Sequence, residues 1–513
     1  MRRSPLLRWA PLALVAMSVA MTQPAFAAGP LPSVVAGQAG GAVVRLKVMT
    51  FNVEYGGTVI DFSKIVEAAE VSDADVIALN EVYGHAARLA ADAGYDYVSR
   101  RLDVISRYPL LDPAGADGRY IFVQTSPGQV VAITNVHLSS AHYSPREILD
   151  GWSRKKVLRN ERVTRLPEIR PVAKTMLPLA DAGIPSFIVG DFNAPSHLDW
   201  VRETVGRHPQ VRYPVRWPVS LLLTSKGFVD TYRDAHPSPV ADWGTTWPAQ
   251  RPRSPDSWNP RRDAPRDRID QIWVAGAATT VRSKIVGERG GSGVDIGVKP
   301  WGSDHRAVVS TVDVTPATTP VTVAVEPRRV SQGKVLTATY HAPGDPGERV
   351  VIVPTGGDPA TDAIDQAPTP APMDVDGSLA FATGAWAPGG YDAVLVSSTD
   401  AELSRAGFFV RFPGAGPLVD TSSWGYDVGE PITVRWEGMP GNRFDWAAIY
   451  RRGADPADGA YLAYIYTGSA VTGSVTFDAD SMKRWPLAPG RYTAWVLVSD
   501  VYRAVGGADF VVR

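Results

Sequence analysis

The sequence predicts a layered α/β domain followed by two β-sandwich domains. Between residues 43 and 314, short apolar segments of strand length alternate with helical segments. Beyond that point short strands with Gly/Pro turns recur without helical periodicity, and part of this region is repeated. The 513 residues also exceed one ordinary domain, at about 150 residues per domain. We therefore expect domains at 43–314, 315–413 and 414–513.

The amino-terminal segment has the pattern of an export signal. Three arginines occur in the first eight residues, an apolar run extends from Trp9 to about Met21, and Ala25–Ala27 has the small-x-small form of a cleavage site. The apolar run is shorter than the roughly 20 residues that span a bilayer. This pattern predicts a signal peptide at 1–27, a linker at 28–42 and a secreted, extracellular mature chain without a transmembrane segment. The arginines leave a twin-arginine export route open.

Composition and charge exclude several classes of protein. The chain has no cysteine, which excludes disulfides, thiolate zinc sites and cysteine nucleophiles. The net charge of −1 excludes a wholly basic nucleic-acid binder. Residues 314–513 carry a net charge of −7, whereas the region from the predicted cleavage site to residue 313 carries +3. An anionic substrate is therefore expected to bind the front domain.

The predicted strands of the front domain have cores rich in Val and Ile that do not alternate strictly with polar residues. Such runs are typical of sheets that helices cover. The predicted strands, in chain order, are 46–53, 75–82, 130–138, 185–193, 268–274 and 307–314. Helices are predicted at 63–72 and 153–166. These elements indicate an α/β (α+β) domain.

A Thr/Pro-rich segment at 315–322 separates the front domain from an internal repeat. APGGYDAVLVSS (387–398) matches APGRYTAWVLVS (488–499), and in both copies a turn and a final strand follow. Two copies about a hundred residues apart predict two similar all-β, Ig-like sandwiches with a joint near 413–417. Such domains suggest contact with a cell surface or a glycan, although their aromatic residues also fit ordinary sandwich cores.

Polar residues stand at the ends of the apolar strands in the front domain. In layered α/β folds, functional side chains project from such positions on rigid supports. Taken singly, each residue also has an ordinary explanation as a turn former, a helix cap or a hydrogen-bonded core residue. The candidates are Asn52, Glu54, Glu81, Asn135, His137, Asp191, Asn193, Asp270, Asp304 and His305.

Taken together, the segments TFNVE, IALNEV, NVHL, GDFN, RIDQI and SDH, between residues 46 and 312, resemble the endonuclease/exonuclease/phosphatase superfamily. Its members include deoxyribonuclease I-like nucleases, base-excision endonucleases, bacterial sphingomyelinases and inositol polyphosphate 5-phosphatases. The resemblance implies a four-layer fold, in which helices flank a β-sandwich. It also implies a Mg-dependent phosphoric ester hydrolase that works by direct attack of water on phosphorus.

The resemblance assigns metal ligands at the mouth of the sandwich. The metal residues it assigns are Glu81, at the main ligand position, Asn52 near it, and Asp304 at a further ligand position. Glu54 falls where some relatives carry an acidic ligand and others do not, so its role stays open. Carboxylate oxygens suit Mg²⁺, and Mn²⁺ is the alternative.

The resemblance also assigns the groups that act on the substrate. Asp191 matches the residue that orients or deprotonates the attacking water, and Asn193 the residue that holds this water or the phosphate. His305, paired with Asp270, and His137 match phosphate-contacting positions.

The substrate is predicted only as a phosphate ester: a nucleic acid, a phospholipid headgroup or an inositol phosphate. Asn135 is a candidate substrate contact. Residues 146–174 carry nine basic and four acidic residues, and 251–268 carry six arginines and three aspartates. These stretches would attract polyanions if they lined the rim of the active site. Otherwise they would be ordinary solvated surface. The non-enzymatic alternative is a surface-binding module whose carboxylates bind no divalent metal.

Overall fold

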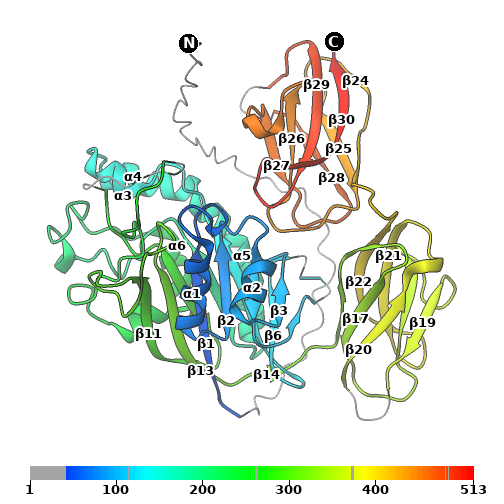
Figure 1. Ribbon diagram of the computed structural model, residues 1–513, viewed down its shortest axis with the longest axis horizontal. Helices are drawn as coiled ribbons and strands as arrows, with labels where there is room; N and C mark the ends of the chain where they lie inside the picture. The colour runs from blue at the N-terminus through cyan, green and yellow to red at the C-terminus, as the bar shows by residue number, and fades with distance from the viewer. Residues whose placement is uncertain are drawn as a thin grey trace, which may run out of the picture.

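The computed structural model describes residues 42–113, 115–116, 118–255, 257, 259, 264–370, 375–479, 481–482 and 485–513. The predicted signal peptide and nearly all of the predicted linker lie outside these residues. The chain forms a large α/β domain and two β-sandwiches, which lie above and beside it in the view of Figure 1. None of the described helices is long and apolar enough to cross a membrane.

Two seven-stranded sheets form the centre of the front domain, as far as the described residues show. The first has the order β12-β11-β13-β1-β2-β4-β3, and the second has the order β5-β6-β7-β8-β10-β9, with β14 paired to β7. The first sheet comprises β1 (Val44–Asn52), β2 (Val76–Asn80), β3 (Tyr97–Ser99), β4 (Val104–Ser106), β11 (Ala278–Glu288), β12 (Ile296–Val298) and β13 (Ala307–Val314). The second comprises β5 (Leu110–Leu111), β6 (Ile121–Ser126), β7 (Gln129–His137), β8 (Ser186–Asp191), β9 (Val229–Asp230), β10 (Asp270–Ala275) and β14 (Ala317–Thr318).

Three apolar layers hold this domain together. Leu46, Val131 and Val189 belong to the core between the two sheets. The outer face of the first sheet packs on α1 (Phe62–Ser72) and α2 (Ala86–Ala93), and the outer face of the second packs on α5 (Arg165–Asp181) and α6 (Pro218–Ser225). Both faces of each sheet are therefore buried, which explains the strand cores without alternation. The predicted four-layer fold is confirmed. The remaining helices are α3 (Ser144–Leu149), α4 (Arg154–Val163) and α7 (Thr231–Ala235).

The single helix predicted at 153–166 is wrong. The chain breaks at Thr164, whose φ of −106° and ψ of −88° are not helical, and α4 and α5 lie on either side of the break. Pro167 favours a break here, because it has no N–H to donate to the carbonyl of Val163 and its ring would clash with that carbonyl, although α5 itself continues through Pro171 and Pro178. Proline is tolerated in the first turn of a new helix, which is where Pro167 lies.

The two β-domains have the same strand order, in agreement with the repeat. The first comprises the sheets β15-β17-β20 and β16-β22-β21-β18-β19, and the second the sheets β23-β25-β28 and β24-β30-β29-β26-β27. The strands of the first are β15 (Thr322–Glu326), β16 (Arg329–Ser331), β17 (Val335–His341), β18 (Arg349–Pro354), β19 (Asp365–Pro368), β20 (Asp376–Ala382), β21 (Gly389–Val396) and β22 (Glu402–Arg411). Those of the second are β23 (Leu418–Thr421), β24 (Gly425–Tyr426), β25 (Ile432–Glu437), β26 (Trp446–Arg451), β27 (Ala463–Tyr466), β28 (Gly473–Phe477), β29 (Gly490–Leu497) and β30 (Ala504–Val512).

Specific polar contacts join the second β-domain to the front domain. The backbone N–H of Arg443 donates to the carbonyl of Arg101 at 3.0 Å, and the Arg101 guanidinium reaches the carbonyl of Ser469 at 3.3 Å. Asp112 of the front domain accepts from Arg101 and from Arg328 of the first β-domain, at 2.8 and 3.1 Å. The carboxy-terminal β-domain is therefore docked on the front domain.

Candidate active site

Strand register brings the polar strand ends of both sheets to one edge of the front domain. In the first sheet Asn52 of β1 lies beside Asn80 of β2. In the second sheet His137 of β7 lies beside Asp191 of β8, and Asp191 lies beside Asp270 of β10. Because the two sheets pack face to face, these side chains converge at the mouth of the sandwich.

Asp191 lies at the centre of this group, between two histidines. Its Oδ2 is 3.7 Å from Nε2 of His305 and 3.6 Å from Nε2 of His137. The opposite ring nitrogen of His305, Nδ1, is 3.0 Å from Oδ2 of the buried Asp270. Asp270 thus orients the His305 ring and leaves Nε2 directed at Asp191. His137, Asp191, Asp270 and His305, which the sequence predicts to act in one site, therefore lie together in the structure.

Asn52 links the first sheet to this centre. Its Nδ2 donates to Oε1 of Glu81 and to Oδ2 of Asp191, both at 3.1 Å. Its Oδ1 accepts the backbone N–H of Glu54 at 3.1 Å, and the backbone N–H of Tyr55 donates to Oε2 of Glu81 at 3.2 Å. Asn52 therefore orients two carboxylates, and its role as a metal ligand stays a prediction.

Burial and crowding of charge shift the titration of the central groups. Burial raises the pKa of Asp191, although the nearby histidines oppose this shift. Burial also raises the pKa of Asp304, to about 7, and His305 opposes this rise. For His305 itself burial lowers the pKa, but the charges of Asp270, Asp191 and Asp304 outweigh it and raise the pKa well above its usual value. These carboxylates therefore favour the protonated form of His305, which can donate from Nε2.

The donor set fits a divalent cation. Ligand atoms of Asp191, Asp270 and His305 lie within 4.8 Å of one another. Oδ1 of Asp270 is buried, and none of the described residues hydrogen-bonds to it. A buried oxygen in this state costs free energy unless water or a bound cation satisfies it. With Glu81 and Asp304 nearby, the site offers the hard oxygen ligands that Mg²⁺ prefers.

The structure places two asparagines in supporting positions. The backbone N–H of Asn193 donates to Oδ1 of Asp191 at 2.8 Å, and its Nδ2 donates to the carbonyl of Leu138 at 2.9 Å. Nδ2 of Asn135 donates to the carbonyls of Leu79 and Leu102, at 2.7 and 2.9 Å, in the interior between the sheets. The predicted substrate contact of Asn135 is not favoured by these bonds, because both of its N–H groups are used.

Sequence reasoning missed the partner of Glu54. The Arg251 guanidinium grips this buried carboxylate through Nη2 to Oε1 at 2.5 Å and Nε to Oε2 at 2.6 Å. Oε2 also accepts the backbone N–H of Asp304 at 2.9 Å. Glu54 therefore anchors the loop that carries Asp304. The indole of Trp247, also missed, donates to Oδ2 of Asp304 at 3.2 Å. No local pattern marks residues so far apart along the chain as partners.

Several arginines of the two basic stretches are internal. Arg268 is fully buried and pairs with Asp199 and Asp230. Arg165 is fully buried and pairs with Glu161. With Arg251 bound to Glu54, these side chains do not line a rim that could attract polyanions.

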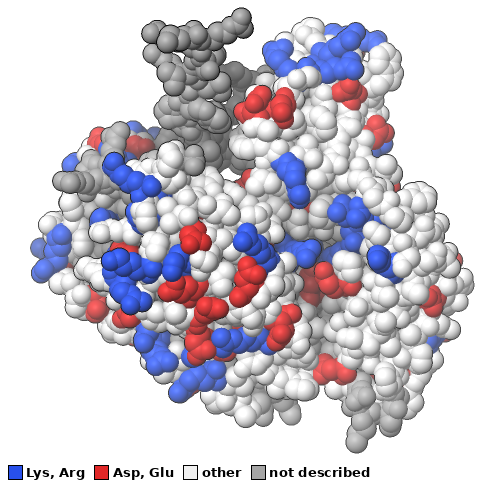
Figure 2. All heavy atoms as spheres, viewed as in Figure 1, with Lys and Arg blue, Asp and Glu red and all other residues white. Residues whose placement is uncertain are grey.

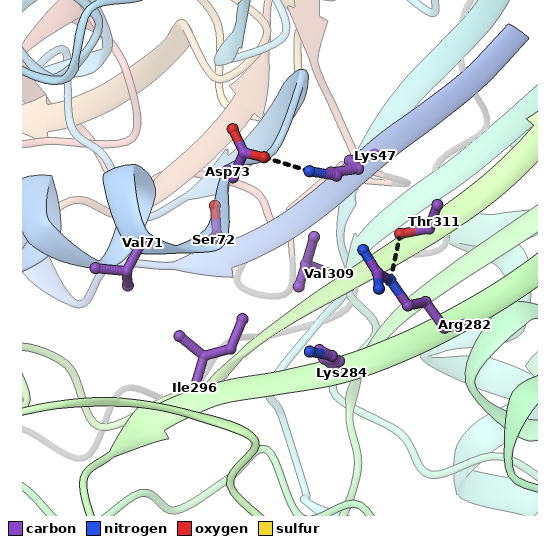
Figure 3. Close-up of a pocket in the computed structure, with 9 residues that line it drawn as sticks. All are labelled: Lys47, Val71, Ser72, Asp73, Arg282, Lys284, Ile296, Val309 and Thr311. Carbon is purple, nitrogen blue, oxygen red and sulfur yellow. Dashed lines mark hydrogen bonds and ion pairs between the residues drawn. The ribbon is translucent and has the colours of Figure 1, made fainter.

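A separate hollow of about 180 Å³ lies on the first sheet beside the end of α1. Figure 3 shows Lys47, Arg282 and Lys284 pointing into it, with Lys47 bonded to Asp73. Lys47 precedes Asn52 by five residues on β1, roughly 17 Å along the strand. This hollow therefore lies away from the strand ends described above.

Comparisons with known proteins find one matching family and several similar chains. Residues 49–305 match the Endonuclease/Exonuclease/phosphatase family. An uncharacterized protein of Caenorhabditis elegans is 30% identical over 257 residues, which cover 45% of this chain and 79% of that protein. Among solved structures, an endonuclease/exonuclease/phosphatase from Beutenbergia cavernae is 18% identical, with 71% of this chain and 99% of that chain covered and a TM-score of 0.32. TDP2 of D. rerio, complexed with single strand DNA product, is 15% identical; the match covers 52% of this chain and 98% of that chain, with a TM-score of 0.33.

Proposed function

The chain belongs to the Endonuclease/Exonuclease/phosphatase family, and on that premise we propose that it is a secreted, divalent-metal-dependent hydrolase of phosphate esters. The observation that carries the proposal is the convergence of Asp191, Asp270 and His305, with one buried carboxylate oxygen left without a hydrogen bond from the described residues. Mg²⁺ is the proposed cofactor, and Mn²⁺ is the alternative.

Glu81 and Asp304 would hold the ion, with Asp270 or Asp191 completing the set. When bound, it neutralises charge on the phosphoryl group as that charge develops. We assign Asp191 the role of accepting a proton from the attacking water, and its central position, with Oδ2 3.6 and 3.7 Å from the two histidine rings, supports this assignment. His305, whose protonated form the surrounding carboxylates favour, would donate to a phosphoryl oxygen from Nε2. His137 offers a second contact to the phosphate.

Each residue in this scheme is oriented by another. Asn52 donates to both Glu81 and Asp191, and Asp270 fixes the ring of His305. Rigid support of this kind keeps the reacting groups in place before the substrate binds. The scheme requires no covalent intermediate, since water attacks phosphorus directly.

The test is hydrolysis of bis-p-nitrophenyl phosphate and p-nitrophenyl phosphate by the full mature chain. We expect EDTA to abolish activity and Mg²⁺ or Mn²⁺ to restore it. Asp191→Asn and His305→Ala should each reduce kcat by about 10²–10⁴-fold with the fold intact by circular dichroism. His341→Ala is the matched control, because His341 forms a similar pair with Asp376, at 2.8 Å, in the first β-domain. Full activity in either site variant would refute the assignment.

Secretion is proposed on the amino-terminal pattern alone. We expect the protein purified from culture medium to begin after Ala27, and intact-mass measurement checks this. A chain retained in the cell with its first 27 residues intact would contradict it.

As the substrate of this chain, nucleic acid is less well supported than a smaller phosphate ester. Figure 2 shows a face on which Lys and Arg interleave with Asp and Glu, rather than a broad basic surface. A nucleic-acid interface usually needs a stronger positive footprint than this. Contact of the carboxy-terminal domains with a cell surface or glycan stays a prediction.

A further inference from the structure

The second β-domain holds a short turn of the front domain. Residues 100–103 form this turn, which joins β3 to β4. The carbonyl of Arg101 in the turn accepts the backbone N–H of Arg443, and the Arg101 guanidinium donates to the carbonyl of Ser469. Arg101 is 9% exposed and Ser469 is 5% exposed. The contact between the two domains is therefore closed to solvent at this turn.

The same turn also supports the strand ends of the active site. The carbonyl of Asp103 accepts the backbone N–H of Leu79 at 2.8 Å, and the carbonyl of Leu102 accepts from Nδ2 of Asn135 at 2.9 Å. Leu79 is the last residue but one of β2, the strand that leads to Glu81. The turn therefore has the docked domain on one side and the catalytic strand ends on the other.

Two buried asparagines continue this support to the centre of the site. Nδ2 of Asn80 donates to Oδ1 of Asn135 at 3.2 Å and to the carbonyl of Val136 at 3.0 Å. Oδ1 of Asn80 accepts the backbone N–H of Asp191 at 2.9 Å. Asn80 thus ties the end of β2, in the first sheet, to β7 and β8 in the second. Together with the bond from Asn135 to the carbonyl of Leu102, these bonds connect the turn to Asp191 without a break.

The turn has little to hold it in place from within. Its two strands, β3 and β4, are three residues long each, and β3 is the edge strand of the first sheet. A short two-stranded hairpin is only marginally stable by itself. Asp103 has a φ of 52°, and a residue other than glycine stays in this left-handed region only where its surroundings hold it there. The contacts with Arg443 and Ser469 therefore contribute to the shape of the turn.

We propose that the second β-domain is a positioning element of the active site, which by holding the turn at 100–103 fixes Asn135 and Asn80 and, through them, the backbone of Asp191. The same bonds fix the end of β2 that leads to Glu81. Asn80 and Asn135 are then positioning residues, which act through the carboxylates rather than on the substrate. This inference rests on the hydrolase activity proposed above. It makes the docked domain a requirement for full turnover rather than only an attachment unit.

Gly118 of the front domain offers a way to loosen this contact without touching the active site. A Cβ at Gly118 would lie 2.5 Å from Oγ and 2.8 Å from Cβ of Ser469, so Gly118→Ala pushes the second β-domain away from the turn. Ser469→Gly removes both of these atoms, and glycine adopts the φ of 64° at this position without strain. Recovery in the double variant Gly118→Ala/Ser469→Gly therefore distinguishes coupling across the interface from local strain at residue 118.

The test is hydrolysis of bis-p-nitrophenyl phosphate by the full mature chain in Mg²⁺. Gly118→Ala should lower kcat at least fivefold and change KM less than twofold, and the double variant should return kcat to within twofold of Ser469→Gly alone. Gly227→Ala is the matched control, because Gly227 has a φ of 82° and no atom within 4 Å of the added Cβ. It should leave kcat within twofold of the unmodified chain. Full kcat in Gly118→Ala, or equal losses in the single and double variants, would overturn the inference.

Hydrogen exchange, followed by mass spectrometry on the full chain, separates this inference from the proposed activity. Gly118→Ala should speed exchange at least fivefold in peptides that span Arg101–Val104 and Leu79–Glu81, and the double variant should reverse this change. Such a result in a chain that hydrolyses neither p-nitrophenyl ester would support the positioning role and refute the proposed function. Unchanged exchange at Leu79–Glu81 in Gly118→Ala would overturn the inference, whether or not the chain is a hydrolase.

Discussion

Gly190, in the segment GDFN, is the position where one added methyl group is expected to do most damage to the site. It lies in β8 with a φ of 138°, directly before Asp191 and beside Val136 of β7. A Cβ at this position would lie 1.9 Å from the carbonyl oxygen of Val136 and 2.8 Å from its backbone carbon and nitrogen. These are main-chain atoms of a buried strand, so no side-chain rotation relieves the overlap.

The cost of Gly190→Ala has two parts. An alanine held at this φ is strained by about 1–3 kcal/mol. Overpacking against a fixed neighbour typically costs a further ~1–3 kcal/mol, and the contact here is with backbone. We therefore expect the free energy of unfolding to fall by about 2–6 kcal/mol. Separation of β7 from β8 would also move His137 away from Asp191, so kcat should fall even in folded protein.

Urea denaturation followed by tryptophan fluorescence measures the loss of stability. Gly206→Ala is the matched control, because Gly206 also has a positive φ, 77°, but no atom lies within 4 Å of the added Cβ. The control should lose only the conformational cost, about 1–2 kcal/mol. If the two variants lost equal stability and Gly190→Ala kept full kcat, the argument from close approach of the strands would be refuted.

Two further outcomes follow from buried charges. Arg251→Gln leaves Glu54 without its cation and should destabilise the chain by about 3–5 kcal/mol in thermal unfolding. The double variant Arg251→Gln/Glu54→Gln should recover part of this loss of stability. A double variant as unstable as Arg251→Gln alone would contradict the pairing. Burial raises the pKa of Asp267 from 3.8 to about 7, so its contribution to stability is complete below about pH 4 and is lost as the pH rises through 7. The Tm of the unmodified chain should accordingly fall more between pH 6 and 8 than that of Asp267→Asn, and parallel Tm profiles would count against this assignment.

The fold was predictable from sequence to the extent that burial leaves a local pattern. Strands buried on both faces, such as β1 and β8, are continuous apolar runs, and the predicted ranges agree closely with the observed ones. The β-domains were predictable because the chain repeats itself. The break between α4 and α5 was missed because charged residues continue through it, although Pro167 was a usable signal.

The central site was predictable for a different reason: its residues stand at strand ends, and strand register is a regular consequence of sheet pairing. His137, Asp191 and Asp270 meet because neighbouring strands end at the same edge. The partnership of Arg251 with Glu54 has no such rule behind it. It joins residues 197 positions apart through a loop, and an arginine in an Arg/Pro-rich segment gives no sign that it will be buried.

The cluster of Trp446 and Tyr450 outside the core of the second β-domain shows where sequence patterns stop being informative. Alternation along β26 predicts that Trp446 and Tyr450 share one face of a sheet, but a sandwich has an inward and an outward face, and aromatic residues suit the inward one. Only the observed pairing shows that the core is filled by the opposite set, which includes Ala447 and Ile449. The outward set is covered within its own domain, since Trp446 is 4% exposed and the rings of Tyr461 and Tyr502 pack on it at 5.7 and 5.8 Å.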